Sequence, residues 1–315
     1  MTEYHNVAFI FPGQGAQYPG MGKDFASEFS EAKQTFEEAD DLLHTGLSSL
    51  IFQGEEEDLK QTKRCQSAIY VDCIAILRVV RTLFPDLRPS VCAGLSLGEY
   101  TALTASERLG FNDCLPLIHH RGQYMHEACE ATKGGMAVIV GLSAAAVEAI
   151  IADINMPEDL WAANFNCPGQ VVISGTERGV EAGAAAAKAQ GAKRVVPLKV
   201  HGAFHSGLMS SAEERLAKHI QAAPIVDGTA DIVMNVPGDY VTNLEDIRTN
   251  LIKQITSPVR WEQGIHVMMD HAVDLFVEMG PGNTLAGMNR RIGVSVPTVS
   301  IDKITDLSAL EKLYR

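Results

Sequence analysis

The sequence predicts an α/β protein in which a large domain built on a parallel sheet carries a smaller inserted domain. Short apolar strands alternate with helical segments along much of the chain, as a parallel sheet with helical crossovers requires. Between residues 132 and 200 the order changes to strand, helix, strand, strand, helix, strand, which is typical of a ferredoxin-like fold. We therefore assign 1–131 and 201–315 to the large domain and 132–200 to the small subdomain.

The first part of the large domain begins with an apolar, β-rich run that Pro12 and Gly13 end. Further along, an apolar segment with helical spacing and almost no charge indicates a buried helix, which Pro85 and Pro89 close. The charged run GEEEDLKQT before it is typical of a solvated turn and a helix start. The expected elements are a strand at 7–11, helices at 24–43 and 67–84, a strand at 91–94, and helices at 96–104 and 112–129.

The inserted segment is bounded by glycines, with Gly134 and Gly135 before it and Gly202 after it. Its expected elements are a strand at 135–141, a helix at 144–153, strands at 160–165 and 170–174, an alanine-rich helix at 177–190 and a strand at 193–200. The large domain then resumes. It includes a late strand at 276–279, which GPGNT ends, and a short helix with Arg290 and Arg291.

Composition excludes several classes of function. Hydrophobic residues make up 46% of the chain and charged residues 21%, as in a soluble globular protein. The net charge of −13 disfavours nucleic acid and anionic membranes as partners, because both need a basic face. We expect no signal peptide, since the N-terminus lacks a basic region and a small-residue cleavage site. The six scattered cysteines form no C-x-x-C pair and fit a reducing cytoplasm.

The stretch Gly94-x-Ser96-x-Gly98 follows a strand and precedes a helix, which is the setting of a nucleophile elbow. Such a turn forces the serine into an unfavourable backbone conformation, and its neighbours must be nearly free of side chain. The hydroxyl then points outward at the helix N-terminus, where the free N–H of Leu97 could hold an oxyanion. The alternative is that Ser96 merely caps the helix.

A serine hydroxyl needs a base, and the segment HGAFHSGLM at 201–209 supplies the best candidate. It lies where the chain re-enters the large domain, and His205 follows the serine in chain order, as in other elbow enzymes. His201 and His205 are four residues apart, so a metal pair is conceivable. Gly202 argues against a helix there and no H-E-x-x-H glutamate is present, so we expect no metal.

Six motifs in one order together resemble the malonyl-CoA:acyl carrier protein transacylases of type II fatty acid synthesis. They are FPGQGAQYPGMG at 11–22, GLSLGEYTAL at 94–103, RGQYM at 121–125, AFHSGLM at 203–209, QITSPVRW at 254–261 and EMGPGNTLAGM at 278–288. The resemblance covers nearly the whole chain. It implies an α/β-hydrolase-like large domain with the inserted small subdomain.

The resemblance also implies roles for single residues. Ser96 resembles the nucleophile, His205 its general base, and Gln254 the glutamine that orients the imidazole. Gln14 resembles the oxyanion-hole residue that acts with Leu97, and Arg121 the residue that pairs with the malonyl carboxylate. Asn166 and Gln66 lie in segments that line the family's cleft. One position departs, because Leu95 stands where the family usually has histidine before the nucleophile.

The resemblance implies a cytoplasmic enzyme that uses malonyl-CoA and phosphopantetheinylated acyl carrier protein as substrates, without a cofactor. We expect a monomer. Carrier proteins of this pathway are acidic, as this chain is, so docking must depend on a local basic patch. The candidates are Lys188, Lys193, Arg194 and Lys199, or Arg290 and Arg291.

Three other functions remain open on the sequence. A serine thioesterase would share the elbow but gives no reason for Arg121. A non-catalytic module that binds carrier protein would not need Ser96. A polyketide-type acyltransferase would use the same fold and residues, although HGAFH resembles the malonyl-selective pattern of such domains.

Overall fold

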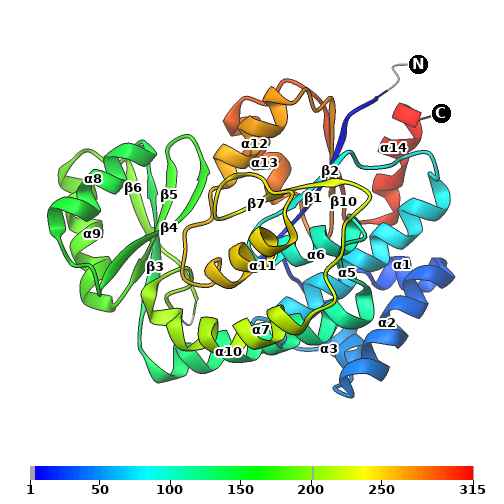
Figure 1. Ribbon diagram of the computed structural model, residues 1–315, viewed down its shortest axis with the longest axis horizontal. Coiled ribbons are helices and arrows are strands. Elements are labelled where there is room, and N and C mark those ends of the chain that lie inside the picture. Colours follow the sequence, from blue (N-terminus) through cyan, green and yellow to red (C-terminus); the bar gives the residue numbers. More distant parts are fainter. Residues whose placement is uncertain (1–3, 201, 315) are drawn as a thin grey trace.

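The computed structural model describes residues 4–200 and 202–314 and contains two sheets that lie side by side (Figure 1). One sheet has six strands and the other four. The small sheet with its two helices forms one end of the molecule, and the large sheet with helices on both faces forms the rest. The predicted α/β class with an inserted antiparallel sheet is therefore confirmed. The domain limits at 131/132 and 200/201 stay a prediction.

The large sheet has the strand order β10-β9-β1-β2-β7-β8. All neighbouring pairs are parallel except β7 and β8, which are antiparallel at one edge. The predicted strands at 7–11 and 91–94 are confirmed residue for residue. The six strands are β1 (Val7–Phe11), β2 (Val91–Gly94), β7 (Asp231–Met234), β8 (Asp239–Tyr240), β9 (Leu275–Met279) and β10 (Thr298–Ile301).

Both faces of this sheet are covered, which explains why β1 and β2 are apolar throughout instead of alternating with polar residues. Ala8 and Ile10 pack against helices α12 (Trp261–Asp270) and α13 (Thr284–Ile292). Phe9 and Phe11 point the other way, into the larger core that contains α5 (Thr62–Leu83). The carboxyl ends of β1 and β2 lie next to each other, and the loops that follow them carry Gln14 and Ser96.

Helices differ from the sequence prediction mainly at their ends. The helix expected at 24–43 is two helices, because Phe29 has extended backbone and interrupts the run. The buried helix expected from residue 67 begins at Thr62, so its first turn carries polar residues. The remaining helices of the large domain are α1 (Lys23–Glu28), α2 (Ser30–Leu43), α3 (Leu47–Gln53), α4 (Glu56–Leu59), α6 (Gly98–Ala105), α7 (Phe111–Ala131), α10 (Ser210–Ala222), α11 (Leu244–Lys253) and α14 (Leu307–Tyr314).

The small sheet has the order β4-β5-β3-β6, and all its pairs are antiparallel. This is the ferredoxin-like arrangement that the sequence predicts. Helices α8 and α9 pack on one face through a small separate core. The elements are β3 (Gly135–Val140), α8 (Ala144–Ile154), β4 (Leu160–Cys167), β5 (Gln170–Gly175), α9 (Glu177–Ala189) and β6 (Arg194–Pro197).

Backbone hydrogen bonds join the small sheet to a loop of the large domain near the site. Phe165 N–H donates to the carbonyl of Val259 at 2.9 Å, and Val259 N–H donates to that of Ala163 at 2.8 Å. Strand β4 is thereby fixed against the segment between α11 and α12. Long helices α7 and α10 run along one side of both sheets (Figure 1).

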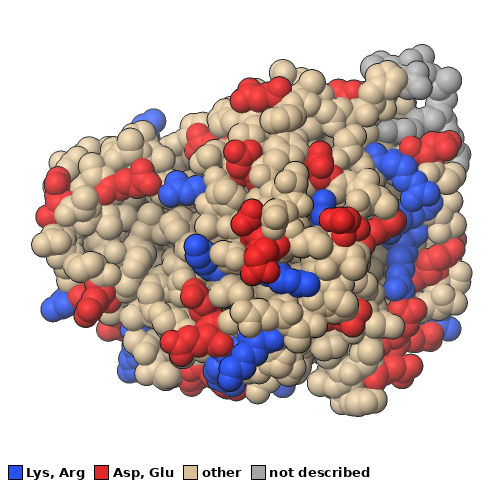
Figure 2. Space-filling model, viewed as in Figure 1, with Lys and Arg blue, Asp and Glu red and all other residues tan. Residues whose placement is uncertain are grey.

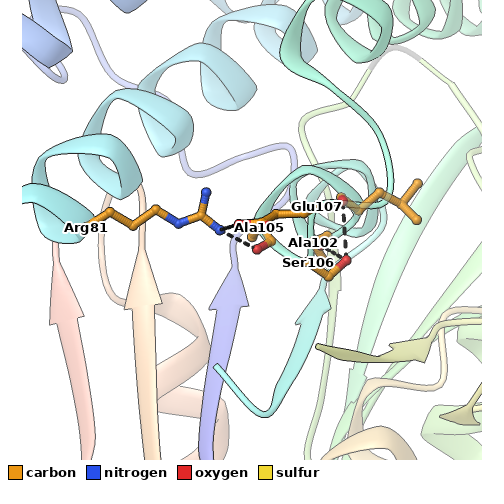
Figure 3. A network of polar contacts seen from close by, with 6 residues as sticks. Arg81, Ala102, Ala105, Ser106 and Glu107 are labelled. Atoms are coloured by element: carbon orange, nitrogen blue, oxygen red, sulfur yellow. Dashed lines mark hydrogen bonds and ion pairs between the residues drawn. The ribbon is translucent and has the colours of Figure 1, made fainter. Parts of the chain in front are cut away.

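The helix that follows the elbow, α6, is also held at its far end. Arg81 on α5 donates to the carbonyl of Ala105 at 2.7 Å and forms an ion pair with Glu107 at 3.5 Å (Figure 3). Ser106 ends the helix and its hydroxyl donates back to the carbonyl of Ala102 at 2.8 Å. These contacts fix the position of the helix whose N-terminus faces the site. Among the described residues, no helix is long and apolar enough to cross a membrane.

Candidate active site

Ser96 occupies the strained turn that the sequence predicts. Its φ of 51° is in the left-handed region, which is unfavourable for a residue with a side chain. A Cβ on Gly94 would come within 1.9 Å of the backbone of Gly98, and one on Gly98 within 2.2 Å of the carbonyl oxygen of Phe11. Both glycines are therefore required by close backbone contacts. The tightness of this strand-turn-helix unit supports the elbow over a simple helix cap.

His205 contacts the serine directly. Its Nε2 lies 2.9 Å from Ser96 Oγ, and its Nδ1 lies 2.8 Å from the main-chain carbonyl of Gln254. Because that carbonyl can only accept, Nδ1 carries the proton and Nε2 is free to accept the serine proton. Burial, and next the positive charge of Arg121, lower the pKa of His205 to about 4. The imidazole is therefore neutral at physiological pH, as a general base must be.

Arg121 is a buried cation at the same place, with 1% of its surface exposed. Its guanidinium donates to Gln66 Oε1 at 2.5 Å, to Gln254 Oε1 at 2.8 Å and to Ser96 Oγ at 3.0 Å. All of these acceptors are neutral. Burial lowers the pKa of Arg121, which reflects the cost of a desolvated charge. A ligand carboxylate near Ser96 would satisfy this charge.

Two backbone N–H groups, those of Leu97 and Gln14, are the predicted donors of an oxyanion hole. Leu97 is the N-cap residue of α6 and directly follows the nucleophile, where a helix leaves its first N–H groups without intrahelical acceptors. Gln14 follows β1 in the adjacent loop and lines the same cavity as Ser96. Its side chain is directed to Thr62, with a 3.3 Å hydrogen bond. The backbone N–H of Gln14 is thus the part that we assign to the oxyanion hole.

A cavity of about 120 Å³ between the elbow, α7 and the small sheet is lined by Ser96, His205, Arg121 and Gln14. It continues into a hollow of about 290 Å³, because both are lined by Gly13, Gln14, Leu95, Asn164 and Leu198. That hollow in turn shares Val138 and Gln170 with a third of about 440 Å³. Arg194 and Arg291 line the third hollow. The three hollows adjoin one another and form a groove that extends from Ser96 towards two arginines, one of which, Arg291, donates to Gln170 Oε1 at 2.6 Å.

The predicted site residues fall into two groups. Ser96, His205, Gln254, Arg121 and Gln66 are joined by direct hydrogen bonds, and Gln14 and Leu97 lie beside them. Asn166 is farther along the groove. It lines the 290 Å³ hollow, and its buried Oδ1 has no hydrogen-bond donor among the described residues.

Comparison with known proteins identifies the family. Residues 8–302 match the acyl transferase domain. The malonyl CoA-acyl carrier protein transacylase of Bacillus subtilis is 42% identical over 94% of this chain and 93% of its own. The acyl carrier protein S-malonyltransferase structure from Vibrio cholerae is 38% identical, with a TM-score of 0.93, over 97% of this chain and 100% of that one. A malonyl-transacylase solved in complex with a type II PKS acyl-carrier protein is 35% identical, with a TM-score of 0.93 over 98% of this chain and 100% of that one.

The chain belongs to the malonyl CoA-acyl carrier protein transacylases. This chain shares the fold of the family and matches its members over nearly the whole length. The resemblance found in the sequence is therefore confirmed.

The structure of this transacylase family member adds two residues that the sequence did not single out. Asn235, just after β7, accepts from Ser96 N–H at 2.7 Å and donates to the carbonyl of Gly94 at 2.8 Å. Glu99, in the first turn of α6, is fully buried and accepts from Asn235 N–H at 2.6 Å. A charged residue directly after the elbow could have signalled Glu99, whereas nothing near Asn235 in sequence indicates its contact.

Leu95, the departure from the family pattern, is half-buried between two parts of the groove. Its side chain packs against the core beside α12 and α13. No hydrogen bond of the Ser96, His205 and Arg121 group depends on the Leu95 side chain. His201, the other histidine of HGAFH, lies outside the described residues.

Proposed function

We propose that this protein transfers the malonyl group from malonyl-CoA to the phosphopantetheine thiol of acyl carrier protein, through an ester on Ser96. The observation that carries the proposal is the meeting of an activated serine with a buried arginine whose partners are all neutral. The serine explains acyl transfer. The arginine explains why the acyl group must bear a carboxylate. The product supplies malonyl units for fatty acid synthesis.

In the first half-reaction, Ser96 Oγ attacks the thioester carbonyl while His205 Nε2 takes the hydroxyl proton. The N–H groups of Gln14 and Leu97 hold the negative charge that develops on the carbonyl oxygen. The intermediate collapses, the carbon–sulfur bond breaks, and His205 returns its proton to the leaving thiolate of coenzyme A. Malonyl remains on Ser96 as an ester.

In the second half-reaction, the phosphopantetheine thiol of the carrier protein enters by the same groove. His205 takes the thiol proton, the sulfur attacks the ester, and the proton passes to Ser96 Oγ as the ester bond breaks. The small cavity around Ser96 limits access of water to the ester between the two steps. This alternation is a ping-pong mechanism.

The base is oriented by a carbonyl and not by a carboxylate. Gln254 O fixes the tautomer of His205, but it stabilises an imidazolium less than an aspartate would. A thioester tolerates this weaker base because a thiolate leaves more easily than an amine. The dyad therefore suits exchange between thiols better than cleavage of amides.

The proposal includes the setting of the reaction. We expect a monomer that acts in the cytoplasm without a cofactor. The six cysteines are all buried and free, which suits a reducing compartment. The expected partner is an acidic acyl carrier protein of the fatty acid pathway, and carriers of polyketide assembly are the alternative.

The test is the intact mass of the protein after mixing with malonyl-CoA in the absence of carrier protein. We expect a gain of one malonyl group, lost in Ser96→Ala. Acetyl-CoA should load poorly on the wild type, at least about tenfold more slowly, because it leaves Arg121 unpaired. Arg121→Ala should remove this preference.

Other outcomes would reject the proposal. Release of free malonate without an adduct would indicate a thioesterase. Absence of both adduct and release would indicate a protein that binds carrier protein without catalysis. Equal loading of malonyl and acetyl groups on the wild type would show that Arg121 does not read the carboxylate.

A further inference from the structure

The side chain of Gln254 is bonded at both ends of its amide. Its Nε2 donates to the carbonyl of Ser96 at 2.9 Å and to Glu99 Oε2 at 2.6 Å. Its Oε1 accepts from Arg121 at 2.8 Å. Gln254 therefore links a buried carboxyl group to the buried guanidinium, while its main-chain carbonyl holds His205.

The surroundings of this amide determine which way it points. Around Nε2 lie acceptors, namely Ser96 O, Glu99 Oε2 and Asn235 Oδ1, and opposite lies the donor Arg121. If the amide flipped, its NH₂ group would face the guanidinium and its oxygen would face the other acceptors. The bonds at both ends would then be lost. Gln254 thus presents an oxygen to Arg121 because acceptors surround its other end.

Glu99 anchors this set of contacts because both oxygens of its carboxyl group are engaged. Both of its oxygens accept from nitrogen donors, Oε1 from Asn235 N–H and Oε2 from Gln254. Burial raises the pKa of Glu99 to about 8, against the opposing effect of these bonds and of Arg121. Tyr100, the other titratable group that interacts with Glu99, is also buried.

We propose that Glu99 is a positioning residue for acyl selectivity: it fixes the amide of Gln254 so that Arg121 is held in place for the malonyl carboxylate. This inference depends on the proposed function. Glu99 itself hydrogen-bonds neither Ser96 Oγ nor the Arg121 guanidinium and acts through Gln254. Its loss should therefore affect malonyl more than acetyl, because acetyl makes no use of Arg121.

Glu99→Gln tests the role with little change of shape. One oxygen becomes an NH₂ group, so the new side chain can accept one of the two bonds but meets a donor in place of the other. We expect the KM for malonyl-CoA to rise about tenfold and the malonyl-over-acetyl preference to fall by a similar factor. Acetyl loading at saturation should change less than about threefold, since the main-chain bond from Gln254 to His205 remains.

The matched control is Glu278→Gln. Glu278, at the end of β9, is also fully buried and accepts from Leu285 N–H, Ala286 N–H and Ser300 Oγ, at 2.9, 3.0 and 2.7 Å. Glu278→Gln should lower the free energy of unfolding without altering the ratio of malonyl to acetyl loading. Glu99→Asp keeps both carboxyl oxygens on a shorter side chain and should retain part of the preference for malonyl over acetyl. If Glu99→Gln does not fold, Glu99→Asp serves as the test variant.

The results separate this inference from the proposed function. If the wild type does not load malonyl, the proposed function fails. If the wild type loads malonyl and the Glu99 variants lower malonyl and acetyl loading by the same factor, or leave the preference unchanged, Glu99 has a structural role alone and the inference is overturned.

Discussion

At the scale of single residues, the site combines a neutral base with an uncompensated cation. His205 and Arg121 both hydrogen-bond Ser96 Oγ, and the positive charge of Arg121 helps to keep the imidazole unprotonated. The charge that we propose selects a carboxylate therefore also favours the neutral form of the base. Substrate selection and activation of the nucleophile are coupled through two contacts to one oxygen.

This coupling predicts the pH dependence of acylation. The reactive form has neutral His205, which is lost as the pH falls through its pKa of about 4. Single-turnover loading of malonyl should therefore hold its rate from pH 7 to about 5 and decline near 4, well below the usual histidine value of about 6.5. Arg121→Met should move this decline to higher pH. A wild-type decline centred near 6.5 would contradict the assignment of a buried neutral base.

The same shift affects stability. Because the folded pKa of His205 lies below the unfolded value, the unfolded state binds more protons between about pH 4 and 6.5. His205 should therefore lower the free energy of unfolding as pH falls through that window. Urea unfolding at pH 5 and 7 should show a smaller loss in His205→Gln than in the wild type. An equal loss in both proteins would assign the pH dependence to other groups.

At the scale of elements, the sequence predicted best where a pattern is local. The strands at 7–11 and 91–94 are apolar runs with clear ends, and the elbow glycines identify the turn. The sequence did not predict strands β7, β8 and β10, which are at most four residues long, or helices α3, α10 to α12 and α14. The bonds of Glu99 and Asn235 were missed because they join residues more than 130 positions apart, although the charge of Glu99 directly after the elbow was a local signal.

The elbow itself predicts a sharp difference between two glycines in helices. Gly98→Ala should lower the free energy of unfolding by about 3 kcal/mol, since its Cβ would strike the backbone of Phe11 at 2.2 Å. Gly287→Ala, inside α13, meets nothing within 4 Å and should stabilise the protein by about 0.5–1 kcal/mol. Urea denaturation measures both. Similar effects in the two variants would mean that the elbow relaxes more easily than its contacts indicate.

The tether of α6 gives a second prediction about elements. Arg81→Ala removes the bond to the Ala105 carbonyl and should cost about 1–2 kcal/mol of stability. Glu107→Ala removes an ion pair that is half-exposed and should cost less than about 0.5 kcal/mol. If the two variants lose equal stability, the ion pair and not the carbonyl bond holds the helix end.

At the scale of the whole molecule, the net charge of −13 opposes docking of an acidic carrier protein. Figure 2 shows acidic and basic side chains interspersed over one face of the molecule. Two exposed arginines lie at the far end of the groove. Arg194 is on strand β6 of the small sheet, and Arg291 is on helix α13, which packs on the large sheet. An acidic carrier protein would therefore be attracted by the local positive charge at the end of the groove and not by the net charge of the molecule.

Arg290 allows this to be tested without altering the groove lining. It is exposed and neighbours Arg291, but does not line the hollow. Arg290→Glu should raise the KM for carrier protein about fivefold and leave malonyl loading from malonyl-CoA unchanged, because a rim charge acts mainly on encounter. The matched control is Lys33→Glu on α2, which makes the same change in net charge away from the groove. Raising the salt concentration should reduce the difference between Arg290→Glu and the wild type. Equal effects of the two variants would mean that total charge governs docking, and an equal change in both half-reactions would place Arg290 in the path of coenzyme A.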